Sequence, residues 1–474
     1  MTADEPKQLT RRDFLKAMGT AFLGLALSGC EFAPAVSPSP TTTPIPGGPR
    51  VEISRARVAI RYENITDGVL TGRIIGQTTD ILKETHTDLV FRGFWKWLPV
   101  VDSPDSIPPE LLELAPQGTT LEQAADALRR SGYYYQELQR WIGAIKKEIP
   151  NLIFVGSIPA QGLFRVEYNP ITEKVYSTNE TWAMALDPQK WNIARNGSPV
   201  TKEELQRWWH ERWPYGGRVD PYDWQKTEMY LPDITNPIYQ DLLLSWAKKQ
   251  IDCGADAIWI DMLYVQAGLL SYITEDIHHP SVRESFEDAS KIIDEIHKYG
   301  ESRGKHIYVG TWSWYLPSSD IAEVLKQISG GDIPYSAPGV DFLTMAPSVE
   351  EVENKAINES KWEEAVLATR KEFGDIPIFA FIDDAQDVSQ TVSFSQKLSS
   401  EEQREVLRTF DSSFTKMGVN FIYPLHGGYM GNGEITTKLA WGKYRTYDAL
   451  APEFDTYPTI RELAQRKASR DIPE

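Results

Sequence analysis

The sequence predicts an α/β fold, a single (β/α)8 TIM barrel with a long Trp-rich insertion after the third strand. Two observations lead to this prediction. Short runs of β-branched and aromatic residues alternate eight times with longer amphipathic helical patterns, and the runs are apolar enough to be covered on both faces, as in a parallel sheet. One connection, which ends near Pro237, is much longer than the others.

The eight expected strands follow one another along residues 51–474, which we assign to one barrel domain with an insertion at 163–232. Their bounds are Arg57–Glu63, Asp88–Phe94, Leu152–Ser157, Ala257–Met262, His306–Trp312, Asp341–Ala346, Ile376–Ile382 and Asn420–Leu425. Helical patterns between them include 121–148, 281–303, 348–373 and 399–417.

The fourth strand carries the most informative carboxylate of the chain. Asn236 suits a helix N-cap and Pro237 the first helical position, and Gly254 ends the helix that follows. The apolar run after Gly254 ends at Asp261. Asp261 therefore lies at the carboxyl end of a strand, where TIM barrels place their reacting groups.

The insertion after the third strand is roughly eighty residues long, a length that normally marks a functional loop or a small subdomain. It leaves the carboxyl end of its strand and should overhang the same face. Its tryptophans either stack on a flat ligand or form its own small core; they are Trp182, Trp191, Trp208, Trp209, Trp213 and Trp224.

Polar and aromatic residues gather at the other strand ends as well, and a barrel brings them to one mouth. In chain order they are Arg61, Glu63, Arg92, Trp95, Asp261, Trp312, Trp314, Asp383, Asp384 and His426, the last followed by two glycines. We expect Arg61, Arg92, Trp95, Trp312, Trp314 and His426 to bind substrate.

The carboxylates of this set fit glycosidic bond cleavage, which needs one protonated and one ionised carboxyl group. Asp261 would be the nucleophile or base and Asp383 or Asp384 the general acid, with Glu63 as a third candidate. Only one of Asp383 and Asp384 should face the barrel axis, because side chains alternate along a strand. We expect Asp261 to share a solvent-filled, aromatic-rimmed mouth with the second acid.

Each of these residues also has a structural interpretation. Asp261 could accept backbone hydrogen bonds at the strand end, the Asp383–Asp384 pair could cap a helix, and Glu63 could merely neutralise Arg61 or Arg92. We expect no cofactor and no metal site, since His278 and His279 have no spaced third ligand.

The stretch from Asp233-Ile-Thr-Asn-Pro237 to Trp259-Ile-Asp-Met262 resembles the TIM-barrel glycoside hydrolase-like superfamily. It looks like glycoside hydrolase family 31, whose Trp-x-Asp-Met-Asn-Glu motif carries the nucleophile, although Leu263 and Tyr264 stand where that family has Asn-Glu. It is also similar to the endo-α-1,4-polygalactosaminidase-like barrels. The resemblance covers about thirty residues and implies that Asp261 is the nucleophile.

The amino terminus predicts export. Two adjacent arginines in Thr10–Lys16 precede the apolar stretch Ala17–Leu27, as in a twin-arginine signal, and Leu27-Ser-Gly-Cys30 resembles a lipoprotein lipobox. We expect residues 1–30 to be this signal, 31–50 to be a Pro/Thr/Ser-rich linker, and Cys30 to anchor the protein to the membrane after passage through the twin-arginine machinery. A cleaved signal with an incidental cysteine, or an uncleaved helix, is the alternative.

The amino-acid composition favours some classes of ligand over others. The formal charge of −18 disfavours nucleic acid, while 15 tryptophans and 21 tyrosines suit a flat-faced ligand such as a sugar. The only other cysteine is Cys253, so an acylated Cys30 leaves no intramolecular disulfide.

The sequence thus predicts an extracytoplasmic glycosidase that acts on an oligo- or polysaccharide. The alternative from another class is a carbohydrate-binding surface lipoprotein on a barrel that has lost catalysis. A solute-binding lipoprotein would need two lobes around a hinge, which a single eightfold alternation disfavours.

Overall fold

The computed structural model describes residues 52–67, 72–115, 117–195, 197–212, 229–315, 333–383, 389–429, 440–441 and 444–469. The expected signal, the linker and the lipidation residue Cys30 lie outside these residues. Within the described ranges, no helix combines the length and the apolar character needed to cross a membrane.

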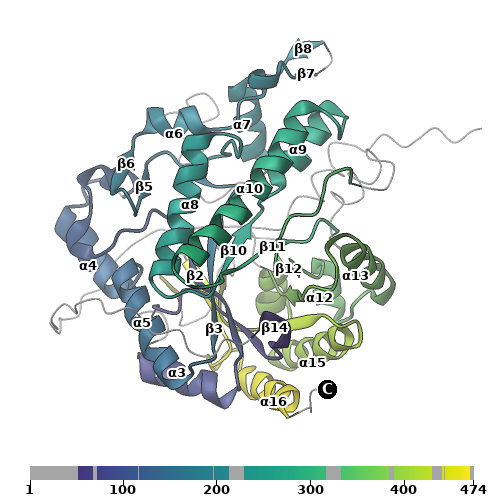
Figure 1. The fold of residues 1–474 in the computed structure, drawn as a ribbon. Helices are drawn as coiled ribbons and strands as arrows, with labels where there is room; N and C mark the ends of the chain where they lie inside the picture. The colour runs from purple at the N-terminus through teal and green to yellow at the C-terminus, as the bar shows by residue number, and fades with distance from the viewer. Residues whose placement is uncertain are drawn as a thin grey trace, which may run out of the picture.

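Eight parallel strands form a closed barrel (Figure 1). They are β1 (Ala59–Tyr62), β2 (Leu89–Trp95), β3 (Ile153–Pro159), β10 (Ala257–Asp261), β11 (Tyr308–Trp312), β12 (Phe342–Met345), β13 (Ile378–Phe381) and β14 (Asn420–Tyr429). Each strand pairs with the next one in this order, and β14 pairs back with β1. The predicted (β/α)8 TIM barrel and all eight of its strands are confirmed.

A short antiparallel extension adds to the barrel after its last strand. β16 (Tyr444–Asp448) pairs with β14, and β15 (Ala440–Trp441) pairs with β16. The hydrophobic pattern did not indicate these strands, because β15 has two residues and β16 five, too few for a clear periodicity. The extension matters for the site, since it brings Asp448 next to His426.

Helices surround the barrel on the outside of the strands (Figure 1). The longer ones are α3 (Ile75–Glu84), α4 (Leu121–Ser131), α5 (Tyr135–Glu148), α8 (Pro237–Asp252), α9 (Val265–Thr274), α10 (Pro280–Ser302), α13 (Glu359–Phe373), α15 (Ser400–Lys416) and α16 (Tyr457–Ala468). Asn236 caps α8 as expected, because its side-chain oxygen accepts from the backbone N–H groups of Ile238 and Tyr239.

Two of the expected helices are each divided in two. The pattern at 121–148 forms α4 and α5, since Gly132 adopts a left-handed conformation and ends the first helix. The pattern at 348–373 forms α12 (Val349–Asn354) and α13, and Lys355 is the left-handed residue between them. The hydrophobic periodicity continues across both breaks, so it could not show them.

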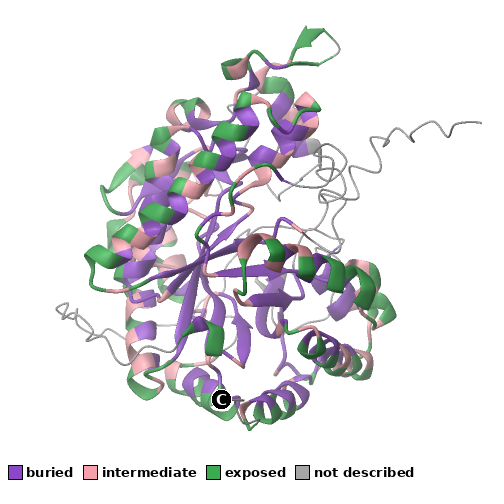
Figure 2. Ribbon diagram, turned by 45° about the vertical axis from the view of Figure 1, so that its right-hand side comes forward, coloured by how far each residue is buried: buried purple, intermediate pink, exposed green. Residues whose placement is uncertain are grey.

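The core has two layers, which follow from the alternation of side chains along each strand. One set of strand residues, including Ala59, Phe91, Trp259 and Phe381, fills the barrel interior. The alternate set, including Ile60, packs against the helices. The barrel strands are buried along their length, and the helices expose mainly their outer faces (Figure 2).

The insertion is built of short elements rather than one long loop. They are β4 (Leu163–Phe164), β5 (Glu167–Asn169), β6 (Lys174–Tyr176), α6 (Thr178–Met184), η4 (Pro188–Trp191), β7 (Ala194–Arg195), β8 (Ser198–Pro199), α7 (Lys202–Arg212) and β9 (Met229–Tyr230). Trp209 has no exposed surface and belongs, with Leu186 and Leu205 of the insertion, to the hydrophobic cluster that also fills the barrel interior. Trp209 is therefore a core residue, in a core that the insertion shares with the barrel.

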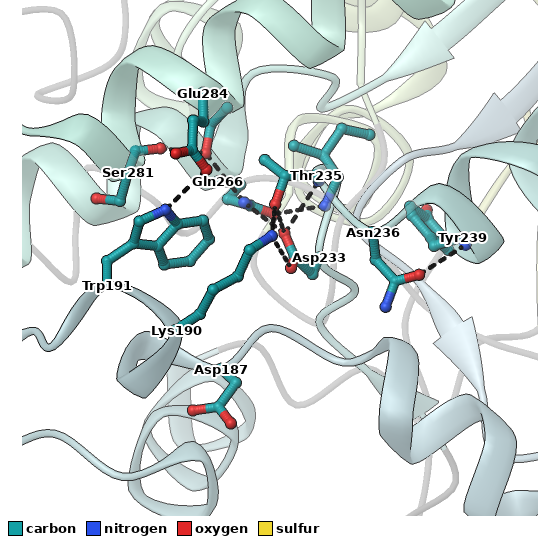
Figure 3. A network of polar contacts seen from close by, with 12 residues as sticks. Asp187, Lys190, Trp191, Asp233, Thr235, Asn236, Tyr239, Gln266, Ser281 and Glu284 are labelled. Atoms are coloured by element: carbon teal, nitrogen blue, oxygen red, sulfur yellow. Dashed lines mark hydrogen bonds and ion pairs between the residues drawn. The ribbon is translucent and has the colours of Figure 1, made fainter.

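Two polar connections hold the insertion to the barrel. A fully buried ion pair joins Lys96, which follows β2, to Glu167 on β5, and burial lowers the pKa of Lys96 to about 8. Near the start of α8, Asp233 accepts hydrogen bonds from Lys190, Thr235 and Gln266 (Figure 3). Glu167 lies near the start of the insertion and Asp233 directly after its end, so polar contacts hold the insertion near both of its ends.

Candidate active site

The carboxyl-terminal end of the barrel, called the mouth below, contains most of the predicted site residues. Asp261 is the last residue of β10 and alternates with Ala257 and Trp259, which both fill the barrel interior. Its carboxylate accepts a hydrogen bond of 2.8 Å from the Gln161 side chain and one of 2.6 Å from the Trp312 indole. These two donors fix the orientation of the carboxylate.

The burial of Asp261 differs from our expectation. We expected a carboxylate that opens on a solvent-filled mouth, but Asp261 has 0% of its surface exposed. The strand alternation was correct, and it placed the side chain inside the barrel. What sequence could not show is that neighbouring side chains close over this position, because such coverage depends on residues from several distant elements.

A group of four charged residues lies on β1, just after it, in the middle of β2 and just after β13. Arg61 pairs with Glu63, and Arg92 lies 3.6 Å from Glu63 and 3.7 Å from Asp383. All four are at most 5% exposed. Two guanidinium groups therefore face two carboxylates in a site with little water, where unpaired charges would be costly. We call these residues the mouth ion-pair cluster.

The cluster shows which groups its acids contact. Glu63 pairs with arginine, as its structural interpretation held, and Asp383 is the aspartate that alternates with Phe379 and Phe381 of the barrel interior. The general-acid role of Asp383 or Asp384 stays a prediction. Asp384 lies outside the described residues.

Three of the nine non-glycine residues with positive φ in the described part of the chain lie beside these carboxylates and arginines. Asn64 next to Glu63, Arg92 itself, and Met262 next to Asp261 have positive φ angles of 52°, 53° and 53°. Residues other than glycine adopt this conformation at a cost of about 1–2 kcal/mol each, and strain of this kind gathers at functional sites. At Arg92 the register of β2 against β3 also shifts. The bulge thus accompanies the inward position of its guanidinium group.

His426 is enclosed rather than open to a ligand. It is 2% exposed, its Nδ1 lies 2.8 Å from Asp448, and its Nε2 lies 3.9 Å from Asp67. Burial lowers the pKa of His426, but the hydrogen bonds to the two aspartates outweigh burial and raise it above the ordinary value. Gly427, at φ 101°, lets the chain pass close to Glu63, where a Cβ atom would lie 2.2 Å from the Glu63 Cβ.

The predicted substrate-binding aromatics divide into two groups. Trp95 and Trp312 line the barrel interior below the mouth: Arg92 lies over the Trp95 ring, and Trp312 stacks on Phe381 with ring centres 5.1 Å apart. Trp314 instead packs edge-on against Tyr264, Phe286 and Phe373 at 4.9–5.3 Å. Because those rings enclose it, Trp314 is not part of the proposed site.

Sequence reasoning missed two residues that contact the candidates. Gln161, which orients Asp261, follows the carboxyl end of β3, so the rule that polar residues gather at strand ends could have found it. Asp448, which orients His426, lies on the antiparallel strand β16, and no signal in the sequence pointed to that strand. His279, considered as a metal ligand, instead caps α10 through its ring nitrogen.

No protein-family model and no curated protein matches this chain. It is similar to solved structures that include the cyclomaltodextrin glucanotransferase CldA, at 11% identity over 89% of this chain and 80% of that one, with a TM-score of 0.42. Amy13B of Eubacterium rectale matches at 12% identity over 88% and 78%, with a TM-score of 0.41. The glycoside hydrolase domain of PelA from Pseudomonas aeruginosa matches at 11% identity over 78% and 94%, with a TM-score of 0.35. Similarities this weak do not bear on function, and the fold assignment rests on the strand order.

Proposed function

We propose that this protein is a glycoside hydrolase that acts on an oligo- or polysaccharide at the mouth of its barrel, with Asp261 as the catalytic carboxylate. The observation that carries the proposal is the placement of Asp261, which ends β10 inside the barrel and accepts hydrogen bonds from Gln161 and Trp312. Catalysis in TIM barrels occurs at this end of the strands, where a carboxylate with a fixed orientation can act on a substrate.

In this proposal Asp261 acts as the nucleophile or as the base that activates water. The side-chain N–H groups of Gln161 and Trp312 donate hydrogen bonds to its carboxylate, and such hydrogen bonds favour the ionised form. The mouth ion-pair cluster supports the position of the neighbouring strand ends. Substrate reaches Asp261 only when the side chains over it move, and this requirement is part of the proposal.

The test compares two aspartates of the same strand region. Asp261→Asn should reduce sugar release from a polysaccharide panel, amino-sugar polymers included, by about 10²–10⁴-fold. Asp256→Asn is the matched control: Asp256 precedes β10 at the opposite end of the barrel and pairs with Lys146, so this variant should keep its turnover. Circular dichroism verifies that both variants fold. Equal turnover in Asp261→Asn and the wild type would refute the catalytic assignment.

A second candidate function is carbohydrate binding without catalysis. Two observations favour it: Asp261 is fully covered, and Glu63 and Asp383 are both engaged by Arg92. Calorimetric binding of an oligosaccharide by a wild-type protein that releases no sugar from the whole panel would establish this function in place of the first.

We also propose that the protein is exported and held at the membrane by a lipid on Cys30, on the strength of the adjacent arginines and the Leu27-Ser-Gly-Cys30 sequence. Carbohydrate polymers outside the cell would then be its substrates or ligands. Membrane fractionation of the wild type and of Cys30→Ser tests the anchor, because loss of the lipid should move the protein to the soluble extracytoplasmic fraction.

A further inference from the structure

Three potential metal ligands meet at the amino-terminal face of the barrel, the end opposite the mouth. His306 lies two residues before β11, Asp341 directly precedes β12, and His297 lies on α10. β11 and β12 are parallel neighbours, so the residues that precede them lie at the same end of the sheet. Among the described residues this is the one group of three His, Cys, Asp or Glu side chains close enough to hold a metal ion.

The three side chains converge through their donor atoms. The Nε2 atom of His297 lies 2.9 Å from Asp341 Oδ2, and that of His306 lies 3.1 Å from Asp341 Oδ1. The two imidazole rings are nearly parallel, with an angle of 18° and centres 5.6 Å apart, so both nitrogens point at one carboxylate. All three ligand atoms lie within 4.8 Å of one another.

We propose that His297, His306 and Asp341 bind a divalent transition-metal ion, with Zn²⁺ as the best match to the donors. Two imidazole nitrogens and a carboxylate are a common ligand set for zinc, whereas Ca²⁺ and Mg²⁺ prefer oxygen ligands alone. Zinc at about 2.0–2.2 Å from each atom places its ligands about 3.3 Å apart. The histidine–aspartate separations are 2.9 and 3.1 Å, to the two different carboxylate oxygens, and all three ligand atoms lie within 4.8 Å, so small side-chain shifts bring them to this spacing.

The surroundings suit a bound ion that keeps a position for water. The side chains of His297, His306 and Asp341 are 21%, 40% and 20% exposed, so an ion can enter and a fourth ligand can come from solvent. The backbone N–H of Val309 donates to Asp341 Oδ2 at 2.8 Å, which orients the carboxylate as an outer contact of a metal ligand does. The ring of Tyr308 packs edge-on against His306 at 5.0 Å and limits its rotation.

The direct test is calorimetric titration of ZnCl₂ into chelator-treated, tag-free protein. We expect one ion per chain and a rise in the melting temperature on zinc addition. Co²⁺ should give a visible absorption band on binding to the same position. Loss of a contact in the outer shell of a zinc site weakens binding about 10–100-fold, so loss of a direct ligand in His306→Ala should weaken it by at least that factor.

Two further variants keep the result interpretable. His297→Gln should also lose zinc binding, and because the substitution is on a helix at a partly exposed position, the protein should still fold. His278→Ala removes an exposed histidine elsewhere and should bind zinc like the wild type. The proposal is wrong if the wild type takes up no zinc at millimolar concentration, or if His306→Ala and His297→Gln bind it as tightly as the wild type.

Discussion

The two ends of the barrel use similar charged side chains in opposite ways. At the mouth, Arg61, Glu63, Arg92 and Asp383 are nearly inaccessible and engage one another. At the amino-terminal face, His297, His306 and Asp341 also contact one another, yet each remains partly exposed. Burial therefore separates charges that the fold depends on from charges that a ligand can reach.

Exposure therefore has to be known before a carboxylate predicted from sequence is assigned a catalytic or a structural role. Charged residues at the mouth are candidates for catalysis because reactions in TIM barrels occur at that end. Several of them nevertheless form ion pairs with other buried charges of the mouth ion-pair cluster. Two of the three ligands at the opposite face, His306 and Asp341, lie at the starts of strands, where sequence reasoning expects only stability. The comparison predicts large stability effects at the mouth and small ones at the amino-terminal face.

The largest effect is expected when Arg92 is removed from the mouth ion-pair cluster. Arg92→Met leaves Glu63 and Asp383 close together without their shared partner, and breaking a buried pair costs about 3–5 kcal/mol of unfolding free energy. Chemical denaturation measures the change. Arg129→Met is the matched control, because Arg129 pairs with Asp105 and Asp126 on the exposed surface and should cost no more than about 1 kcal/mol. Equal losses in the two variants would mean that burial does not separate the two kinds of ion pair.

A smaller loss of unfolding free energy, with a defined pH dependence, is expected when Asp448 is replaced. Burial raises its pKa, but hydrogen bonds from His426 and Arg73 outweigh burial and lower it, while the pKa of His426 is raised. Asp448→Asn should cost about 2 kcal/mol, the usual value for a hydrogen bond to a charged group.

The sign of the pH dependence follows from the two shifts. The contribution of Asp448 is present above its unfolded pKa of about 4 and is lost as the pH falls through the lowered folded value. The contribution of His426 is complete below about pH 6.5 and is lost as the pH rises through the raised folded value. The difference between wild type and Asp448→Asn should thus be largest between about pH 4 and 6.5. A difference that stays constant from pH 3 to 9 would contradict the pairing.

The smallest loss of unfolding free energy is expected when His306, at the amino-terminal face, is replaced in the absence of metal. His306→Ala removes a partly exposed contact to Asp341 and should change the unfolding free energy by less than about 1 kcal/mol in a chelator-containing buffer. With zinc present, only the wild type should gain stability. A loss of several kcal/mol in the metal-free variant would mean that His306 is a structural residue like those of the mouth.

Much of the fold could be predicted because hydrophobic patterns report local structure directly. The eight strands, the cap at Asn236 and the position of Asp261 at the end of β10 all followed from neighbouring residues. The breaks after α4 and α12 did not, since one left-handed residue ends a helix without changing the apolar pattern around it. The strands β15 and β16 also went undetected.

The barrel, its insertion and the side chains that face its interior could all be predicted, because strand periodicity and helix ends depend on residues near one another in the chain. Three contacts could be seen only in three dimensions: Asp261 is covered, Arg92 connects Glu63 to Asp383, and His297 meets His306 and Asp341. Those contacts join residues far apart in sequence. Their existence depends on how the closed sheet aligns its strand ends, and no local pattern records that alignment.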